Sequence, residues 1–131
     1  MSDKTILVVD DEKNIRILFE DELKEAGFNV ITAENGKEGL RLAQQAKPDL
    51  ILLDIKMPDM HGVEVLQKIR ETDNTTPVIM VTAHGARSPL SKSMTQWAIR
   101  SKELNIADYV TKPVDLDELI TKIRQILHLS L

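Results

Sequence analysis

Polar side chains that could bind a metal ion or a phosphoryl group stand at the ends of four short apolar runs. Asp10 and Asp11 follow the first run, Asp54 follows the third, Thr82 ends the fourth and Lys112 follows the fifth. If these runs are strands of one parallel sheet, their carboxyl ends lie at a single edge, where open α/β sheets bind ligands. The spacing therefore predicts one site that gathers three carboxylates, a hydroxyl and an amine.

The three carboxylates indicate a divalent cation. Asp10, Asp11 and Asp54 would repel one another without a counter-charge and would resist joint ionisation. Mg2+ removes that conflict, because it prefers an octahedron of oxygens from carboxylates, water and a phosphate group. We therefore expect Mg2+, with Mn2+ as an alternative. No His-x-x-x-His or other nitrogen-rich spacing indicates zinc.

Asp54 is the candidate nucleophile of this site. An aspartate beside a bound cation can attack a phosphoryl group and form an aspartyl phosphate. That reaction mainly requires alignment of the reacting atoms and neutralisation of the charge on the phosphoryl oxygens. Lys112 offers a positive charge and Thr82 a hydroxyl donor for two of those oxygens.

Each of these residues also has an ordinary structural interpretation. Asp10 or Asp11 could simply cap the following helix, Thr82 could be a β-branched strand residue, and Lys112 could be a solvated surface charge. Each interpretation is reasonable alone. All of them together, at one edge of one sheet, would be a poor explanation of the pattern.

Five β-like runs alternate with helical segments in this chain. The runs are Thr5 to Val9, Asn29 to Ala33, Leu50 to Leu53, Pro77 to Thr82 and Asp108 to Thr111. The first, third and fourth are apolar at consecutive positions, which is typical of strands covered on both faces. The pattern predicts a doubly wound (βα)5 fold of the α/β class. A strand order of 2-1-3-4-5 would bring the three carboxylates together.

The intervening segments show helical spacing and recognisable ends, and we interpret all their apolar stripes as core. Gly27 stands where a helix C-cap prefers glycine, and Gly62 directly precedes the stripe that begins at Val63. Two pairs, Asn35 with Glu38 and Asp115 with Glu118, are typical helix starts. The stripes are Ile15, Leu18, Phe19, Leu23 and Ala26; Val63, Leu66 and Ile69; and Leu116, Leu119, Ile120, Ile123 and Leu127.

Composition limits the class of protein. The 131 residues predict a single domain, 1–131, and 42% apolar residues are enough for a buried core. A net charge of −4 argues against direct nucleic-acid binding. Without cysteine the chain has no disulfide and no thiolate chemistry. No apolar run is long enough to span a bilayer, so we expect no membrane contact and a soluble, cytoplasmic location.

Five segments of the sequence resemble the receiver domains of bacterial two-component response regulators, and together they are highly specific. The resemblance implies a flavodoxin-like fold with the 2-1-3-4-5 sheet and no output domain on this chain. The segments are Ile6 to Glu12 (ILVVDDE), Ala33 to Gly36 (AENG), Pro48 to Gly62 (PDLILLDIKMPDMHG), Pro77 to Ala83 (PVIMVTA) and Ala107 to Pro113 (ADYVTKP).

The resemblance implies a role for each residue of the predicted site. Asp54 would accept a phosphoryl group from a phosphohistidine on a sensor histidine kinase or a phosphotransfer protein. Asp10, Asp11, Asp54 and the backbone carbonyl of Lys56 would hold Mg2+. Lys112 would bind the phosphoryl group, next to a Lys112–Pro113 peptide bond that is cis in the family.

Two further pairs of residues follow from the same resemblance. Thr82 would move towards the phosphoryl group and Tyr109 would turn inward, so that phosphorylation shifts a two-state equilibrium. Lys56 and His84 match positions that tune hydrolysis of the phosphoryl group. For His84, an exposed loop histidine without a partner is an equally good interpretation.

The chain departs from the family between the fourth and fifth strands. Thirty positions separate Thr82 from Lys112, about two helical turns more than the family usually has. The surplus falls at 86–97, where Ser88-Pro89 favours a helix start, and we expect a lengthened fourth helix. The fourth helix, fifth strand and fifth helix form the face that receivers use for a downstream protein target or a homodimer. The surplus puts the family's usual dimer in doubt.

Side chains in two places would mark an interface if they were exposed. Leu90, Met94 and Trp97 would be anchors for a partner unless they belong to the core. The apolar tail with Ile126, Leu127, Leu129 and Leu131 raises the same question at the carboxyl end.

Two other functions remain open. A phosphate-independent docking module would be expected to lack Asp54, the acidic pair or Lys112, yet all are present. A Mg2+-dependent phosphohydrolase with an aspartate nucleophile commonly carries a second aspartate two residues later, where this chain has Lys56. The leading prediction is therefore a signalling domain rather than an enzyme acting on a separate substrate, although it would catalyse its own phosphorylation and dephosphorylation.

Overall fold

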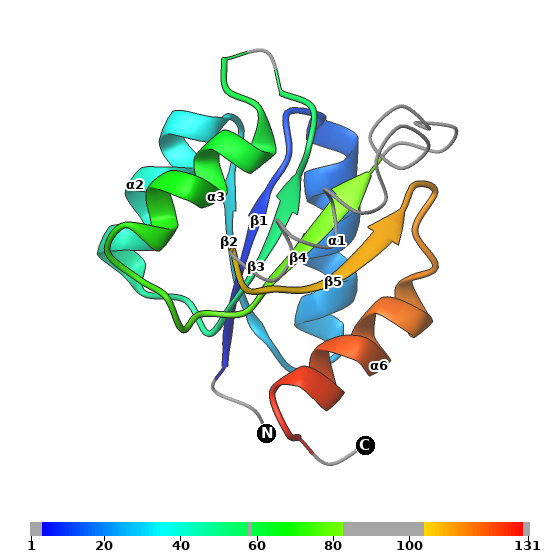
Figure 1. The fold of residues 1–131 in the computed structure, drawn as a ribbon. Coiled ribbons are helices and arrows are strands. Elements are labelled where there is room, and N and C mark those ends of the chain that lie inside the picture. Colours follow the sequence, from blue (N-terminus) through cyan, green and yellow to red (C-terminus); the bar gives the residue numbers. More distant parts are fainter. Residues whose placement is uncertain (1–3, 58, 83–103, 130–131) are drawn as a thin grey trace.

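The computed structural model describes residues 4–57, 59–82 and 104–129. Five strands form one sheet in the order β2-β1-β3-β4-β5, and every neighbouring pair is parallel (Figure 1). The predicted fold class and strand order are confirmed. The strands are β1 (Thr5–Val9), β2 (Asn29–Ala33), β3 (Leu50–Asp54), β4 (Val78–Thr82) and β5 (Ile106–Thr111).

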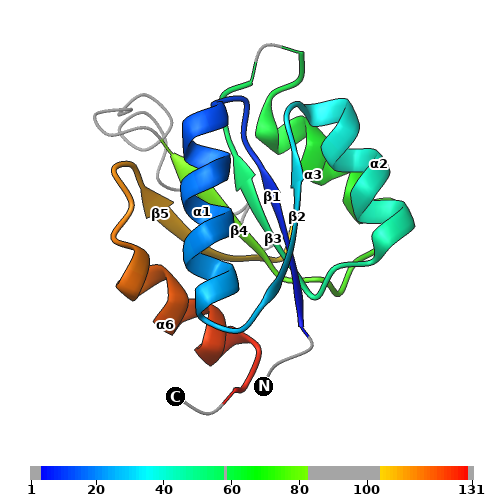
Figure 2. The ribbon, with the colours of Figure 1, turned by 180° about the vertical axis from the view of Figure 1, so that it is seen from behind.

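Four described helices cover the two faces of the sheet. They are α1 (Lys13–Glu25), α2 (Gly36–Ala46), α3 (Gly62–Arg70) and α6 (Leu116–Ile126). Helices α2 and α3 lie on one face, and α1 and α6 lie on the other, as the view from behind shows (Figures 1 and 2). None of the described helices is long and apolar enough to cross a bilayer. The predicted fourth helix and the surplus at 86–97, with Leu90, Met94 and Trp97, lie outside the described residues.

Helix ends follow the capping residues. Asn35 Oδ1 accepts a hydrogen bond from the N–H of Glu38 at 2.8 Å, and Asp115 Oδ1 accepts from Glu118 at 3.2 Å. Both predicted helix starts are therefore confirmed. Gly27, just past α1, has φ of 102°, a left-handed conformation that side chains other than hydrogen disfavour.

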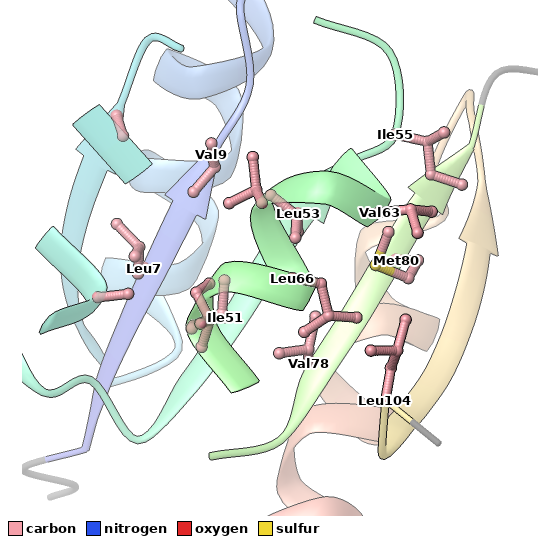
Figure 3. Packing of buried hydrophobic residues seen from close by; sticks show 14 residues of the cluster. Leu7, Val9, Ile51, Leu53, Ile55, Val63, Leu66, Val78, Met80 and Leu104 are labelled. Carbon is pink, nitrogen blue, oxygen red and sulfur yellow. The ribbon is translucent and has the colours of Figure 1, made fainter. Parts of the chain in front are cut away.

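The sheet separates two apolar cores, which we call the front core and the rear core. The front core lies between the sheet and α2/α3, and the rear core lies between the sheet and α1/α6. In Figure 3, side chains from β1, β3 and β4 meet Val63 and Leu66 of α3 in the front core. Ile51 and Leu53 of β3 face the front core, whereas Leu50 and Leu52 face the rear core. This alternation is the period of two that a strand imposes.

Strand burial agrees with the apolar pattern of the sequence. The central strands β1, β3 and β4 are almost wholly buried, and the edge strands β2 and β5 are only partly covered. Two predicted boundaries were wrong. Strand β4 begins at Val78 because Pro77 has no N–H for the ladder. Strand β5 begins at Ile106, two residues before the predicted start, and its register shifts at Ala107.

One residue of the predicted core is on the surface. Phe19 and Leu23 of α1 are buried, but the Leu18 side chain is 44% exposed and Ile17 is 46% exposed. At about 100° per residue, Leu18 lies about 140° around the helix from Leu23. The prediction that Leu18 packs in the core was therefore wrong. By contrast, Leu116, Ile120 and Leu127 of the last stripe pack against the rear core.

Most of the apolar residues at the carboxyl end are packed against the core rather than exposed. Ile126, Leu127 and Leu129 pack against the rear core, and Leu131 lies outside the described residues.

Arg70 fixes the point at which the chain enters β5. Its guanidinium donates to the carbonyls of Leu104 (2.7 Å), Asn105 (3.2 Å), Asp73 (3.0 Å) and Thr76 (2.7 Å). Four carbonyls on one planar cation join the end of α3, the start of β4 and the start of β5. Asn105, just before β5, has φ of 56°, a left-handed conformation that asparagine tolerates better than most residues.

Candidate functional site

The predicted site residues come from the carboxyl ends of neighbouring strands. Val9 of β1 pairs with Leu53 of β3, so Asp10 and Asp54 each stand one position further, at the same edge of the sheet. Thr82 ends β4 and faces Thr111 of β5, and its carbonyl accepts a 2.7 Å hydrogen bond from the Lys112 N–H. The parallel register thus places these residues together at one edge.

Lys112 links the acidic residues of this edge. Its Nζ lies 3.0 Å from Asp10 Oδ2, 3.3 Å from Glu12 Oε1 and 3.6 Å from Asp54 Oδ2. Burial lowers the pKa of Lys112, but its bonds with Asp10 and its attraction to Asp54 outweigh that effect and leave the pKa above its usual value. The ammonium therefore stays charged among these carboxylates. The Lys112–Pro113 peptide bond is cis, as the resemblance implied.

Asp54 is an unusually basic carboxylate. Burial and the neighbouring negative charge of Asp10 raise its pKa to about 6, and Asp11 adds to the rise. Lys112 and a hydrogen bond from the Lys56 N–H lower the pKa by less. The Asp54 residue is 5% exposed. The site therefore destabilises ionised Asp54, and a further cation would relieve that cost.

Three acidic residues at the end of β1 form a group that can bind a cation. Each of Asp10, Asp11 and Glu12 offers one carboxylate oxygen, and the three oxygens lie within 4.8 Å of one another. The oxygen chemistry fits a hard divalent ion such as Mg2+. Burial raises the pKa of nearby Asp54, and the negative charges of Asp10 and Asp11 raise it further, although Lys112 partly offsets them.

Glu12 is a member of this cluster that sequence reasoning did not assign to the site. Its only signal in the sequence is its place directly after Asp10 and Asp11 in the segment Ile6 to Glu12. The structure brings Glu12 to Lys112 because the chain turns into α1 directly after β1. Asp10 also accepts a 2.9 Å hydrogen bond from the Glu12 N–H, so it supports the entry to α1 while pairing with Lys112. The helix N-cap itself is Glu12, without a side-chain cap.

A close backbone contact holds Asp54 in place. The N–H of Gly62, the first residue of α3, donates to the Ile55 carbonyl at 2.7 Å. A Cβ at position 62 would stand 2.3 Å from the Asp54 carbonyl oxygen and 2.8 Å from Ile55 Cα. Only glycine allows α3 to begin this close to the end of β3.

The predicted switch residues lie on the two strands beside the site. The Thr82 hydroxyl donates to the Val110 carbonyl at 3.5 Å, so it is directed to β5 in this structure. Tyr109 is half-buried and packs against the front core. Strand β5 therefore contacts both the site edge, through Lys112, and the core.

The predicted tuning residues are described only in part. Lys56 is exposed in the loop after Asp54, and its N–H lowers the pKa of the Asp54 carboxyl by hydrogen bonding. His84 lies outside the described residues.

Comparisons with known proteins agree with this geometry. The family model of the response regulator receiver domain matches residues 6–124. The chain is 34% identical over 130 residues to sporulation initiation phosphotransferase F of Bacillus subtilis, covering 99% of this chain and 98% of that protein. It is 38% identical to the alkaline phosphatase synthesis transcriptional regulatory protein PhoP of the same species, covering 97% of this chain but 50% of PhoP.

The fold is also similar to that of a solved receiver domain structure. The CheY-like response regulator receiver domain protein of Methanospirillum hungatei matches with a TM-score of 0.84 and 31% identity, covering 97% of this chain and 95% of that one. The chain thus spans about half the length of some curated relatives and nearly all of others.

Proposed function

The chain belongs to the receiver domain family of two-component response regulators, and we propose that it is a signalling switch whose phosphoacceptor is Asp54. The observation that carries this proposal is the position of the Asp54 carboxylate. It is buried at the carboxyl edge of the sheet, 3.6 Å from Lys112 and next to the acidic cluster of Asp10, Asp11 and Glu12. This arrangement supports the proposal because a nucleophile, a cation for the phosphoryl oxygens and ligands for a metal would then stand together.

Mg2+ fits this site as the metal. We propose that the carboxylates of Asp10, Asp11 and Asp54, with the backbone carbonyl of Lys56, would hold it. When bound, Mg2+ neutralises charge on the phosphoryl oxygens. Mn2+ has the same preference for oxygen ligands and would serve as a substitute. Glu12, which contacts Lys112, would adjust the charge of the site from its exposed side.

The reaction proposed for Asp54 is a direct phosphoryl transfer. A carboxylate oxygen of Asp54 attacks phosphorus in line with the leaving nitrogen of a phosphohistidine. The O–P bond forms, the P–N bond breaks, and the electron pair leaves with the imidazole, which takes up a proton. The Lys112 ammonium would exchange its contacts with the carboxylates for a contact with one phosphoryl oxygen. The Thr82 hydroxyl would turn from the Val110 carbonyl and donate to another phosphoryl oxygen. Tyr109 would occupy the space that Thr82 leaves.

The phosphoryl donor is proposed to be a sensor histidine kinase or a phosphotransfer protein, and the output a downstream protein target. Ile17 and Leu18 support a protein donor, because they are large, apolar and exposed on α1, whose first turn adjoins the acidic cluster. The single domain 1–131, the cytoplasmic location, the homodimer and the absence of nucleic-acid binding stay predictions from the sequence.

The mass of the intact protein tests the proposal. The chain is incubated with acetyl phosphate in Mg2+ or in EDTA, beside an Asp54→Asn variant. We expect the mass of one phosphoryl group to be added only in Mg2+ and only with Asp54 present. A folded wild-type protein that gains no mass would instead favour a phosphate-independent docking module. Multiple turnover of small phosphomonoesters would favour a phosphohydrolase.

A further inference from the structure

The loop that follows Asp54 is hydrogen-bonded to the first turn of α2. Asp59, in the loop between β3 and α3, accepts hydrogen bonds from the first two N–H groups of α2. Its Oδ1 lies 3.0 Å from the Gly36 nitrogen and its Oδ2 lies 3.1 Å from the Lys37 nitrogen. The two carboxylate oxygens thus bind two successive backbone donors that the helix itself leaves without partners.

Asp59 and Asn35 share the capping of α2. Asn35 accepts from the third N–H, that of Glu38, at 2.8 Å. A local side chain therefore caps one donor of the first turn, while a residue 22 and 23 positions further along the chain caps the two others. Asn35 is itself one of the residues most favoured at a helix N-cap. The additional contacts fix the position of the loop relative to the helix.

Close packing reinforces this contact. A Cβ on Gly36 would lie 2.8 Å from Met60 Cβ and 2.9 Å from Val65 Cγ2. Gly36 is buried, so Met60 of the loop and Val65 of α3 rest directly on the first residue of α2. Asp59 cannot move outward without losing these hydrogen bonds, and Met60 packs too closely on Gly36 to move inward.

The other end of the loop is fixed to the sheet. The Ile55 N–H donates to the Val81 carbonyl at 3.1 Å, and the Ile55 carbonyl accepts from Gly62 at 2.7 Å. Lys56 therefore lies between a point fixed to the sheet and a point fixed to α2 by Asp59. Its N–H already donates to the Asp54 carboxylate.

We infer that Asp59 is a positioning residue for the cation site: its two hydrogen bonds to the start of α2 restrain the loop that carries Lys56, whose backbone carbonyl is a proposed Mg2+ ligand. This inference rests on the function proposed above. Asp59 is not one of the proposed Mg2+ ligands, and its proposed role is to restrain the loop. Partners that orient metal ligands commonly change metal affinity by about tenfold or more.

Asp59→Ala and Asn35→Ala form a matched pair that tests this role. Each removes a cap from the first turn of α2, but only Asp59 also holds the loop. The readout is the dissociation constant of Mg2+ alone, without a phosphoryl donor, from amide chemical shifts in a titration. We expect Asp59→Ala to weaken Mg2+ binding by about fivefold or more. We expect Asn35→Ala to lower the melting temperature while changing the dissociation constant less than twofold.

Asp59→Asn provides a folded variant of nearly the same shape. Its amide keeps one acceptor oxygen of the two, so we expect an intermediate dissociation constant and faster hydrogen exchange at Gly36 or Lys37. The inference is overturned if both Asp59 variants bind Mg2+ as wild type does. It is also overturned if Asn35→Ala weakens binding as much as Asp59→Ala. A wild-type protein that does not bind Mg2+ at all would instead overturn the proposed function, and the inference with it.

Discussion

The Lys112 ammonium forms its shorter ion pair with Asp10, at 3.0 Å, and not with the proposed phosphoacceptor Asp54, at 3.6 Å. Asp10 is nearly inaccessible to solvent, so Lys112 is the principal cation that compensates its charge among the described residues. The same Asp10 carboxylate is a proposed Mg2+ ligand. The ammonium and the metal therefore compete for one carboxylate before phosphorylation.

Lys112→Ala is expected to bind Mg2+ several-fold more tightly than wild type, because the competing positive charge is removed. In EDTA the same variant is expected to lose about 2 kcal/mol of unfolding free energy, since the buried Asp10 carboxylate keeps its hydrogen bond from the Glu12 N–H but loses its counter-charge. Urea unfolding in EDTA and in saturating Mg2+ measures both effects, and Mg2+ should recover much of the loss. Unchanged or weaker Mg2+ binding by a folded Lys112→Ala protein would contradict the competition.

The raised pKa of Asp54 predicts a pH-dependent stability. The folded-state pKa is about 6, above the value near 3.9 of an unfolded chain, so the folded state binds more protons between these values. The contribution of Asp54 is therefore fully present below about pH 4 and is lost as pH rises through about 6. In EDTA, wild type should lose about 3 kcal/mol across this window through Asp54.

Asp54→Asn is the control for that prediction. Because asparagine does not ionise, the variant should lack this slope and should be more stable than wild type above about pH 6. Unfolding free energies from urea titrations at intervals between pH 4 and pH 8 give the difference between the two proteins. A difference that is constant over the whole range would show that burial of Asp54 does not raise its pKa.

Gly62→Ala should damage the site more than the fold elsewhere. The new Cβ would meet the Asp54 carbonyl oxygen at 2.3 Å, and a backbone atom in a central strand cannot move aside cheaply. We expect a loss of about 3 kcal/mol in unfolding free energy and phosphorylation by acetyl phosphate that is at least about tenfold slower. Phosphorylation at the wild-type rate would show that the close contact does not position Asp54.

Gly27→Ala is the matched control for Gly62→Ala. Nothing lies within 4 Å of a Cβ at position 27, and the only strain comes from its φ of 102°. The expected loss of stability is about 1 kcal/mol, with an unchanged rate of phosphorylation.

The exposed residues Ile17 and Leu18 of α1 should matter for a protein phosphoryl donor but not for a small-molecule donor. Leu18→Asn should change the unfolding free energy by less than about 0.5 kcal/mol, whereas Phe19→Ala next to it should cost about 3 kcal/mol or more. The rate with acetyl phosphate should stay as in wild type for Leu18→Asn. Transfer from a phosphorylated histidine kinase domain that is competent with wild type should slow by about tenfold. Equal rates with both donors would remove α1 from the donor interface.

Much of the fold could be predicted because strand and helix patterns repeat along the chain. Continuous apolar runs predicted the buried central strands, and Asn35 and Asp115 predicted two helix starts. The pattern failed where a single residue had to be assigned to a face. Leu18 has the spacing of a core residue relative to Ile15, yet the sheet contacts the side of α1 that carries Phe19 and Leu23. Which side meets the sheet is decided by packing between elements.

The sequence indicated which residues gather at the site better than it indicated which hydrogen bonds and ion pairs they form. Strand ends indicated Asp10, Asp54 and Lys112 together, because parallel strands deliver their carboxyl ends to one edge. The sequence could not show that Glu12 joins Lys112, since that contact depends on how the chain turns into α1. The bonds from Asp59 to the start of α2 were equally hidden, because they join loops that are distant in sequence.

The sheet between the front core and the rear core acts as a partition within the protein. Alternate side chains of β3 belong to different cores, so space emptied on one face cannot be refilled from the other. Losses of packing on opposite faces should therefore add, while losses on one face share neighbours and should not. Asp54 stands where this partition ends. Evolution can accordingly exchange the residues of either helical layer separately, adapting one surface to new partners while the backbone beneath the proposed phosphoacceptor keeps its place.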